Sequence, residues 1–171
     1  VNISAKADTY LLMPSLSVSV SGGKAAVGGT ISVIVAGSRT IADVFAGAEL
    51  ISAGAAAISA AAKDKFVSAL GSVSAAPSGS GAVAAAVNVL VATAETRAKV
   101  GDGATVSAAG NAAITAESDL WMFVLGMSAS GASKAGVGAS VIVNVLNRTT
   151  EANLGKDAKL IATDGSALVQ A

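Results

Sequence analysis

The feature that most constrains the fold is an internal repeat of about 55 residues. The stretch VGDGATVSAAGNAAITAESD (100–119) follows the same pattern as the segments at 44–64 and 154–171. Ile58, Ile114 and Leu168 hold one slot of this pattern, at spacings of 56 and 54 residues, and Ile3 lies 55 residues before Ile58. Similarity at such a period is typical of solenoids, in which each repeat packs on its neighbours.

An alignment that starts at Tyr10 divides a single array, 1–171, into units 10–64, 65–119 and 120–171. The chain starts in mid-pattern and without Met, so we expect a fragment excised from a longer chain, with any signal peptide outside it. We predict that two sets of equivalent residues form inward columns. Further sets align at Thr40/Thr96/Thr150, Val44/Val100/Leu154 and Ala48/Ala104/Ala158, and the two predicted inward columns are Ala42/Ala98/Ala152 and Leu50/Val106/Leu160.

Composition narrows the function classes. Eleven basic and eleven acidic side chains cancel, so no basic surface indicates a nucleic-acid partner. The chain has no Cys and no His, which removes thiolate, imidazole and soft-metal chemistry. We therefore expect no catalytic, cofactor-binding or metal-ligating residues. The mean hydropathy is +0.68, but the longest apolar run, 81–94, contains Asn88 and is shorter than a spanning helix needs, so we expect no membrane insertion.

The local period is two, which predicts strands. SLSVSVS (15–21) places Leu16, Val18 and Val20 on one face and serines on the other, and ATVSA (104–108) turns Val106 inward. The alanine-rich segment 53–76 is the one place where a helix competes. Its aligned segments carry β-branched residues and turn glycines, so we favour strand there too.

One repeated strand is apolar on both sides. It reads TISVIV at 30–35, AVNVLV at 86–91 and SVIVNV at 140–145. Either a neighbouring strand or loop of the same unit covers the second side, or that side is an exposed stripe used for lateral packing between molecules. We favour the covered arrangement.

These patterns predict an all-β fold, a parallel β-helix or β-solenoid built from three repeats of about 55 residues. We expect about five short strands and two turns of the solenoid per unit, giving six to eight coils and a rod of about 30–40 Å. In an alternative, 66–75 and 83–92 form a hairpin beside a thinner solenoid, with APSGSGA as its loop.

The run GVGASVIVNVLNRTTEANLGKDAKLIA (136–162), with the segment before it, resembles the leukotoxin-type (LktA family) filamentous adhesins, very large secreted proteins of anaerobic Gram-negative bacteria. The resemblance covers most of the chain and is best in the third unit. Gly28-Gly29-Thr30 in the first unit departs from the family's Gly-Ala-Ser. The resemblance implies a β-helical stalk at the outer-membrane surface or released from it.

Four motifs could carry chemistry, and each has a structural interpretation that we favour. Gly101-Asp102-Gly103 is a turn rather than a calcium or phosphate loop, and Asn147-Arg148-Thr149 matches a glycosylation acceptor but suits a turn. Glu95, Arg97, Lys99, Arg148 and Glu151 could form a charge ladder across coils. Tyr10, Phe66 and Trp121, spaced by 56 and 55 residues, suit a core ladder or cap more than a stacking platform for a sugar.

The sequence thus favours a non-catalytic structural or adhesive stalk segment over an enzyme, because no carboxylates or basic residues cluster through the repeats. The alternative is a carbohydrate-binding or carbohydrate-active β-helix module; a flat threonine array for ice or sugar is weakened because outward threonines occur singly. Expected partners are neighbouring repeats of the parent chain, other copies through the solenoid ends or edge, and a host-cell receptor or glycan.

Overall fold

The computed structural model describes all residues, 1–171, as ten β-strands with no helix. Every strand pair is parallel, and the strands form three sheets in the orders β1-β4-β7-β10, β2-β5-β8 and β3-β6-β9. The predicted all-β class is confirmed, and so is a strand in the alanine-rich segment. The bounds are β1 Asn2–Val20, β2 Ala25–Val44, β3 Glu49–Ser52, β4 Ala56–Ala76, β5 Gly81–Val100, β6 Thr105–Ala108, β7 Ala112–Ala132, β8 Ala135–Leu154, β9 Lys159–Ala162 and β10 Ala167–Gln170.

The chain visits the three sheets in turn, so that β1–β3, β4–β6 and β7–β9 make three successive passes. Hydrogen-bonded partners lie 54–56 residues apart, as the sequence period predicts. Both predicted columns are confirmed, since Ala42 pairs with Ala98 and Leu50 pairs with Val106, and their third-pass partners follow in register.

One predicted slot is wrong by a single residue. Val169, not Leu168, pairs with Ile114, and Leu168 pairs with Ala113. The turn before β10 spans residues 163–166, whereas the turn before β7 spans only 109–111. The extra residue shifts the register, and a shift of one exchanges the two faces of a strand.

The predicted strand lengths are also wrong. Each pass contains two strands of 19–21 residues and one of four, so about 55 residues make one pass and not two. Gly71 and the serines on either side of it lie inside the long strand β4. The alternative hairpin is wrong as well, because β4 and β5 belong to different sheets joined by a turn at 77–80.

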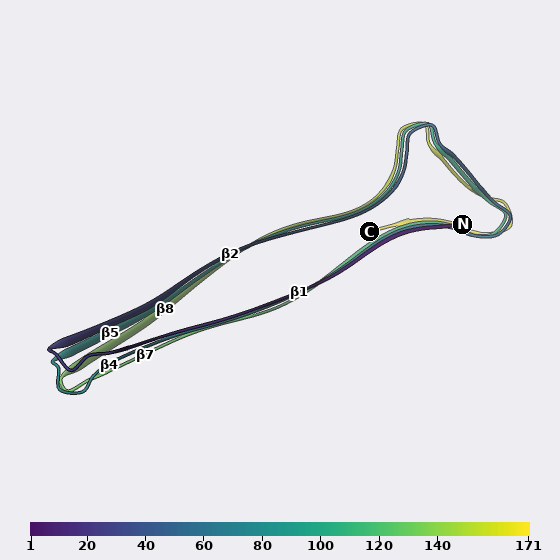
Figure 1. Cartoon of the computed structure of the whole chain (residues 1–171). Coiled ribbons are helices and arrows are strands. Elements are labelled where there is room, and N and C mark those ends of the chain that lie inside the picture. Colours follow the sequence, from purple (N-terminus) through teal and green to yellow (C-terminus); the bar gives the residue numbers. More distant parts are fainter.

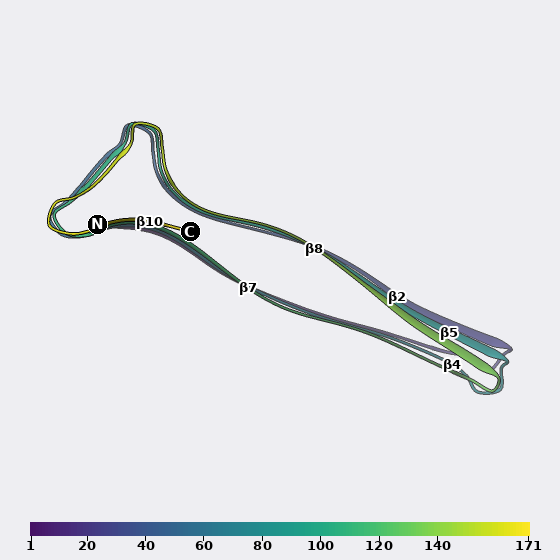
Figure 2. The same cartoon turned by 180° about the vertical axis from the view of Figure 1, so that it is seen from behind.

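The molecule has two parts, which we call the base and the blade (Figures 1 and 2). In the blade, the far ends of the two long sheets lie face to face and run to a common tip, with turns at 21–24, 77–80 and 133–134. At the other end the long sheets diverge, and the short sheet β3-β6-β9 closes a triangular base. The base alone has room for a core between three walls.

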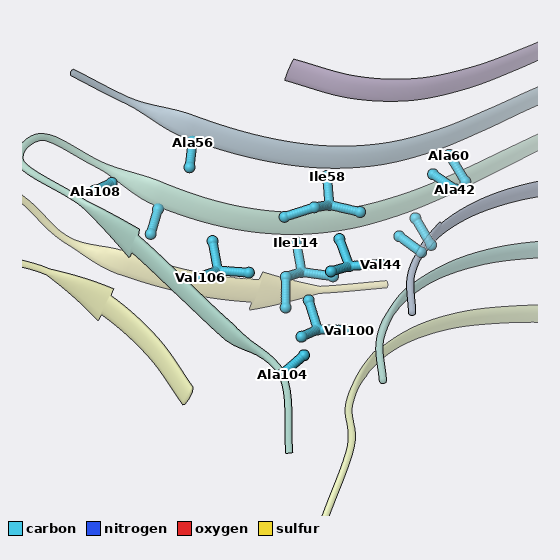
Figure 3. Close-up of a cluster of buried hydrophobic side chains, with 13 residues drawn as sticks. Ala42, Val44, Ala56, Ile58, Ala60, Val100, Ala104, Val106, Ala108 and Ile114 are labelled. Carbon is cyan, nitrogen blue, oxygen red and sulfur yellow. The ribbon is translucent and has the colours of Figure 1, made fainter. Parts of the chain in front are cut away.

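The core of the base contains aliphatic side chains from all three sheets, with isoleucines and valines surrounded by alanines (Figure 3). Ile58, Val100, Val106 and Ile114 are completely buried. The wider cluster consists of Ala42, Val44, Ala56, Ile58, Ala60, Ala98, Val100, Ala104, Val106, Ala108, Ala112, Ile114 and Ala116.

Inside the blade the two long sheets approach so closely that large side chains do not fit along much of its length. A Cβ added to Gly28 of β2 would lie 3.1 Å from the carbonyl oxygen of Val73, and one added to Gly138 of β8 would lie 3.0 Å from that of Ser128. The tip interior is accordingly a small cluster of Ala26, Ala76 and Ala82. A larger cluster around Phe66 and Leu90 fills the middle of the two long sheets.

Polar side chains separate these apolar clusters inside the blade. Asn88 donates a hydrogen bond to the Ser68 hydroxyl at 2.8 Å. Thr30 donates to the Ser17 hydroxyl at 2.7 Å or to the Gly71 carbonyl at 2.9 Å, its single proton serving one of them at a time. These bonds join the opposed sheets directly, which a thin interior permits.

The turns at the top of the base, between β2 and β3, β5 and β6, and β8 and β9, stack in register. Gly47, Gly103 and Asp157 are the only residues with positive φ, at 69°, 66° and 57°, and they occupy the same turn position in successive passes. A left-handed conformation costs a residue with a Cβ about 1–2 kcal/mol, less for Asp. The third pass therefore carries strain that the first two avoid.

The inward and outward assignment in the base predicts unequal effects for two adjacent substitutions. Val106→Asp buries an unpaired carboxylate and should lower the free energy of unfolding by about 3 kcal/mol or more. Thr105→Asp, whose side chain points outward, should cost less than about 0.5 kcal/mol. Denaturant unfolding of both variants checks this, and equal losses would contradict the assignment.

These stacked turns predict a stabilising substitution. Asp157→Gly should raise the free energy of unfolding by about 0.5–1 kcal/mol, because glycine adopts positive φ without steric cost. Lys156→Gly, one residue earlier at a position without positive φ, serves as the control and should be neutral or destabilising. Thermal unfolding that ranks the two variants in the reverse order would show that no strain resides at Asp157.

Candidate interaction surface

The blade reverses the usual distribution of side chains. The alternation predicted for 15–21 is confirmed, but the serines point between the sheets while Leu16, Val18 and Val20 are 70%, 63% and 70% exposed. On β4 the serines also point inward, and Ser68 and Ser72 are buried between the sheets. The outer surfaces of the blade are therefore the part of the molecule with an unusual apolar character.

The outer side of β2-β5-β8 carries a flat apolar array that we call the valine face. Its residues occupy four columns of three, with Ile31, Val33 and Val35 78%, 64% and 77% exposed. No other element covers this side, so the favoured prediction of a covered strand is wrong. The residues of a pass are already used in the two long walls, the short wall of the base and the turns, so none remain to fold over the outer side. The columns are Val27/Val83/Val137, Ile31/Val87/Val141, Val33/Val89/Val143 and Val35/Val91/Val145.

The outer side of β1-β4-β7 is apolar but uneven. The central strand β4 presents Ala69 and Gly71, while Leu16 of β1 and Met127 of β7 stand on either side of them. The result is a shallow groove with a hollow of ≈ 330 Å³. Its lining residues are mostly aliphatic and include no charged side chain.

A charged ladder borders the valine face on the side of the base. Glu95 of β5 lies 3.0 Å from Arg39 and 2.8 Å from Arg97, and Arg97 lies 3.0 Å from Glu151. The predicted pairing of Glu95, Arg97 and Glu151 is confirmed, with Arg39 as an addition. Exposed pairs of this kind contribute little stability, so the ladder marks a boundary of the surface more than it holds the fold.

Two members of the predicted charge ladder are not part of it, although Lys99 lies on the same outward side of β5 as Arg97. Lys99 takes part in no ion pair. Arg148 pairs in register with Ala94, on the inward side of β8, and donates a hydrogen bond to the Ser118 hydroxyl at 2.6 Å. Because β8 is an edge strand, a long side chain can enter the interior there without displacing another pass.

The predicted aromatic set is divided between two faces. Phe66 is buried in the core of the middle section, whereas Tyr10 and Trp121 lie outward in one column with Lys65 between them. Trp121 stacks on Phe123, with ring centroids 6.3 Å apart. The sequence spacing placed Phe66 at the position that Lys65 occupies in the structure. An alignment error of one residue moves a side chain from the outer side of a strand to the inner side.

The remaining motifs have structural roles. Gly101–Gly103 forms a turn, as predicted, and the Asp102 carboxylate accepts a hydrogen bond from the backbone N–H of Lys156 at 3.0 Å. Asn147 lies in β8 on the outward side, so its predicted place in a turn is wrong. No group of three or more acidic side chains is arranged to hold a metal ion.

Both ends of the strand stack are open. β2 and β8 are the edge strands of one long sheet, and β10 covers only residues 112–115 of β7 in the other. Inward residues of the third pass are consequently half-exposed: Ile142 is 41% and Leu146 43% exposed, whereas their second-pass partners Asn88 and Ala92 are buried. An open edge of this kind presents both unpaired backbone groups and apolar side chains.

One buried carboxylate lies inside the stack, near the junction of base and blade. Asp64 is 2% exposed, and one of its oxygens accepts a hydrogen bond from the Ser38 hydroxyl at 3.2 Å. Its other oxygen has no hydrogen-bond partner, nor do the hydroxyls of Thr40 and Thr96. A buried charge with a single hydrogen bond is a cost to the fold.

Removing that charge should stabilise the protein. Asp64→Asn keeps the shape and an acceptor for Ser38, and should raise the free energy of unfolding by about 1 kcal/mol or more at neutral pH. Asp43→Asn, on the exposed side of β2, is the matched control and should change it by less than about 0.5 kcal/mol. A loss of stability in the Asp64 variant, measured by denaturant unfolding, would show that the carboxylate is compensated.

No family model, curated protein sequence or solved structure matches the chain. The structure contains no helix with the length and hydropathy needed to cross a membrane. The resemblance to the LktA-family adhesins and the secreted or cell-surface location remain predictions from sequence.

Proposed function

We propose that the chain is a non-catalytic structural segment of a parallel β-solenoid, in which each repeat of about 55 residues makes one pass. The observation that carries this proposal is the pair of open strand edges lying over half-buried inward columns. Such edges are completed by a further pass of the same kind. A secreted or surface-displayed bacterial adhesive fibre, as the family resemblance implies, is the setting we propose.

The side-chain columns support continuation past the third pass. Since β10 already covers residues 112–115 of β7, a first pass can stack on a third in the observed register only from Ala5 onward. Lys6 then lies over Glu117 and Glu49 lies over Lys159. Inside, Leu50 follows Leu160 and Ala42 follows Ala152. One outward column opposes the join, since Asp8 would lie over Asp119. Stacking of separate copies should therefore be real but weak.

A carbohydrate-binding module is the second candidate, favoured by one observation. Trp121 is 52% exposed on the outer side of β1-β4-β7, four residues along β7 from Leu125 of the groove, and it shares a column with Lys65 and Tyr10. Aromatic faces with a nearby donor suit sugars, but the groove lining is mainly aliphatic. A glycan or host-cell receptor bound there should be lost in Trp121→Ala, and binding that survives this change would remove the candidate.

End-to-end stacking predicts how one inward substitution alters association. Ile142→Lys places a charge over the open end of the interior, which should suppress addition of another copy while its aliphatic stem still covers the core. Sedimentation at rising concentration should show open-ended oligomers for the unmodified chain and at least tenfold weaker association for the variant.

Asn147→Lys is the matched control because it adds the same charge on the outward side of the same edge strand, in a column where a stacked first pass presents only Gly37. It should associate like the unmodified chain. Equal loss in both variants would indicate a general charge effect, and purely monomeric behaviour of the unmodified chain would contradict stacking. Turnover of a glycan or peptide substrate that a groove substitution abolishes would contradict the non-catalytic role.

A further inference from the structure

We infer that the valine face is a pairing surface for a second copy of this chain, bound face to face with its tip pointing the opposite way. This interaction is separate from the stacking of passes, because the valine face lies at right angles to the strand edges. The composition, size and shape of that face all suit such a pair.

The valine face is uniform to a degree that solvent exposure alone does not explain. Its twelve positions hold eleven valines and one isoleucine. The charged ladder of Arg39, Glu95, Arg97 and Glu151 begins only beyond it, toward the base. Surfaces of soluble monomers rarely keep so large an apolar array without charges, and such arrays mark interaction sites.

The size of the face suits a weak pair. Eight residue steps along the strand and three strands across give a flat area of about 27 Å by 14 Å, or about 400 Å² per copy. Two copies would bury about 800 Å² or somewhat more, below the range of standard stable interfaces. The paired state should therefore appear only at high concentration, with a Kd of about 10 μM to 1 mM.

The shape of the face selects the orientation. Within the outward series, the column Gly29/Ala85/Ala139 is small and lies between the Val27 and Ile31 columns. A two-fold axis through the Ile31 column, with the strands reversed, brings the Val33 column opposite this small column and the Val27 column opposite the Val35 column. With the tips aligned, the small columns would face each other and leave a void.

The base favours the same orientation. Figure 1 shows that it rises above the plane of the outer side of β2-β5-β8, whereas the blade is thin up to its tip. Two bases on the same side would collide, while opposed tips place each base beyond the other copy's tip. A self-complementary patch of this kind closes as a two-fold pair and does not extend indefinitely.

A lipid surface is the other occupant that an apolar face could suit. The free edges of β2 and β8 argue against immersion in hydrocarbon, because their unpaired backbone groups would lose water without gaining partners. A second copy covers the face and leaves those edges in water. We therefore favour the second copy, and the test below separates the two.

The test uses the full chain with Ile142→Lys, so that stacking is suppressed and pairing is measured alone. We expect sedimentation equilibrium to show a monomer–dimer equilibrium, weakened at least tenfold by Val33→Thr, Val89→Thr and Val143→Thr together. The matched control is Val18→Thr, Val67→Thr and Val73→Thr, on the outer side of the other long sheet. The control should leave the dimer unchanged, and thermal unfolding of both variants verifies that they remain folded.

Cross-linking tests the orientation, because the chain has no cysteine of its own. Because facing sheets pack about 10 Å apart, too far for a direct disulfide, the cross-linker is a bismaleimide with a spacer of about 8 Å. It should join Ile31→Cys to itself, and Val27→Cys to Val35→Cys in a mixture of the two variants, but not Val27→Cys to itself. Self-linking at all three positions would contradict the opposed tips. A monomer up to 1 mM (a concentration chosen as about the upper Kd bound), or equal weakening by the control, would overturn the pairing. Flotation with phosphatidylcholine vesicles that only the valine-face variant abolishes would identify lipid as the occupant instead.

Discussion

The close approach of the two long sheets is the constraint on which the rest of the structure depends. Where a Cβ at Gly28 would lie 3.1 Å from the carbonyl oxygen of Val73, the interior accepts only glycine, alanine, serine and similar small residues. Strands of about 20 residues nevertheless favour β-branched side chains, and only the outer faces have room for them. The reversed distribution in the blade follows from this geometry. Apolar burial between the two sheets is correspondingly small there, and each sheet is held by its own continuous backbone ladders. In the whole molecule, 86 of the 106 backbone hydrogen bonds lie within strands.

Parallel stacking in register adds a second constraint, because each residue touches its own equivalents above and below. Like charges in one column would repel, and the outward columns avoid this within the chain: Lys63 lies between Asp8 and Asp119, and Glu95 lies next to Arg39. Inward columns tolerate polar residues when these find a partner in the opposite wall, as Asn88 does with Ser68. Asp64 has such a partner in Ser38, although its second oxygen is unpaired, whereas the buried hydroxyls of Thr40 and Thr96 have no partner at all. The effect of a residue on stability therefore depends on the equivalent residues above and below it in the same column.

The period and the alternation were predictable from sequence, because equivalent residues recur every 54–56 positions and successive side chains leave opposite faces. The length of the strands was not, since Ser68, Ser72 and Ser74 resemble turn residues but sit where the walls meet, and Gly71 between them lies on the outer side of the same strand. The valine face was within reach of the sequence. Counting by twos from Val100, which the base must bury, puts Asn88 and Leu90 inside and Val89 and Val91 outside. The assumption that valines point inward assigns every residue of these strands to the wrong side. The alignment of Leu168 with Ile114 makes the same one-residue error, because the turn before β10 has one extra residue.

The open edges and the valine face point in different directions, and the two interactions scale differently with the number of passes. Each added pass contributes two strands of about 20 residues to the stack and one member to each of the four apolar columns. The strength of a face-to-face pair thus grows with the length of the stack, while the strength of each join between passes stays the same. Three passes give a face of marginal size, and a longer solenoid would pair far more tightly without any new kind of contact. Once two stacks pair, their valine faces are buried, and the uneven groove of β1-β4-β7 is the apolar surface that remains exposed to solvent. A fibre built this way would be two stacks wide, and its grooved sides would be what another molecule meets.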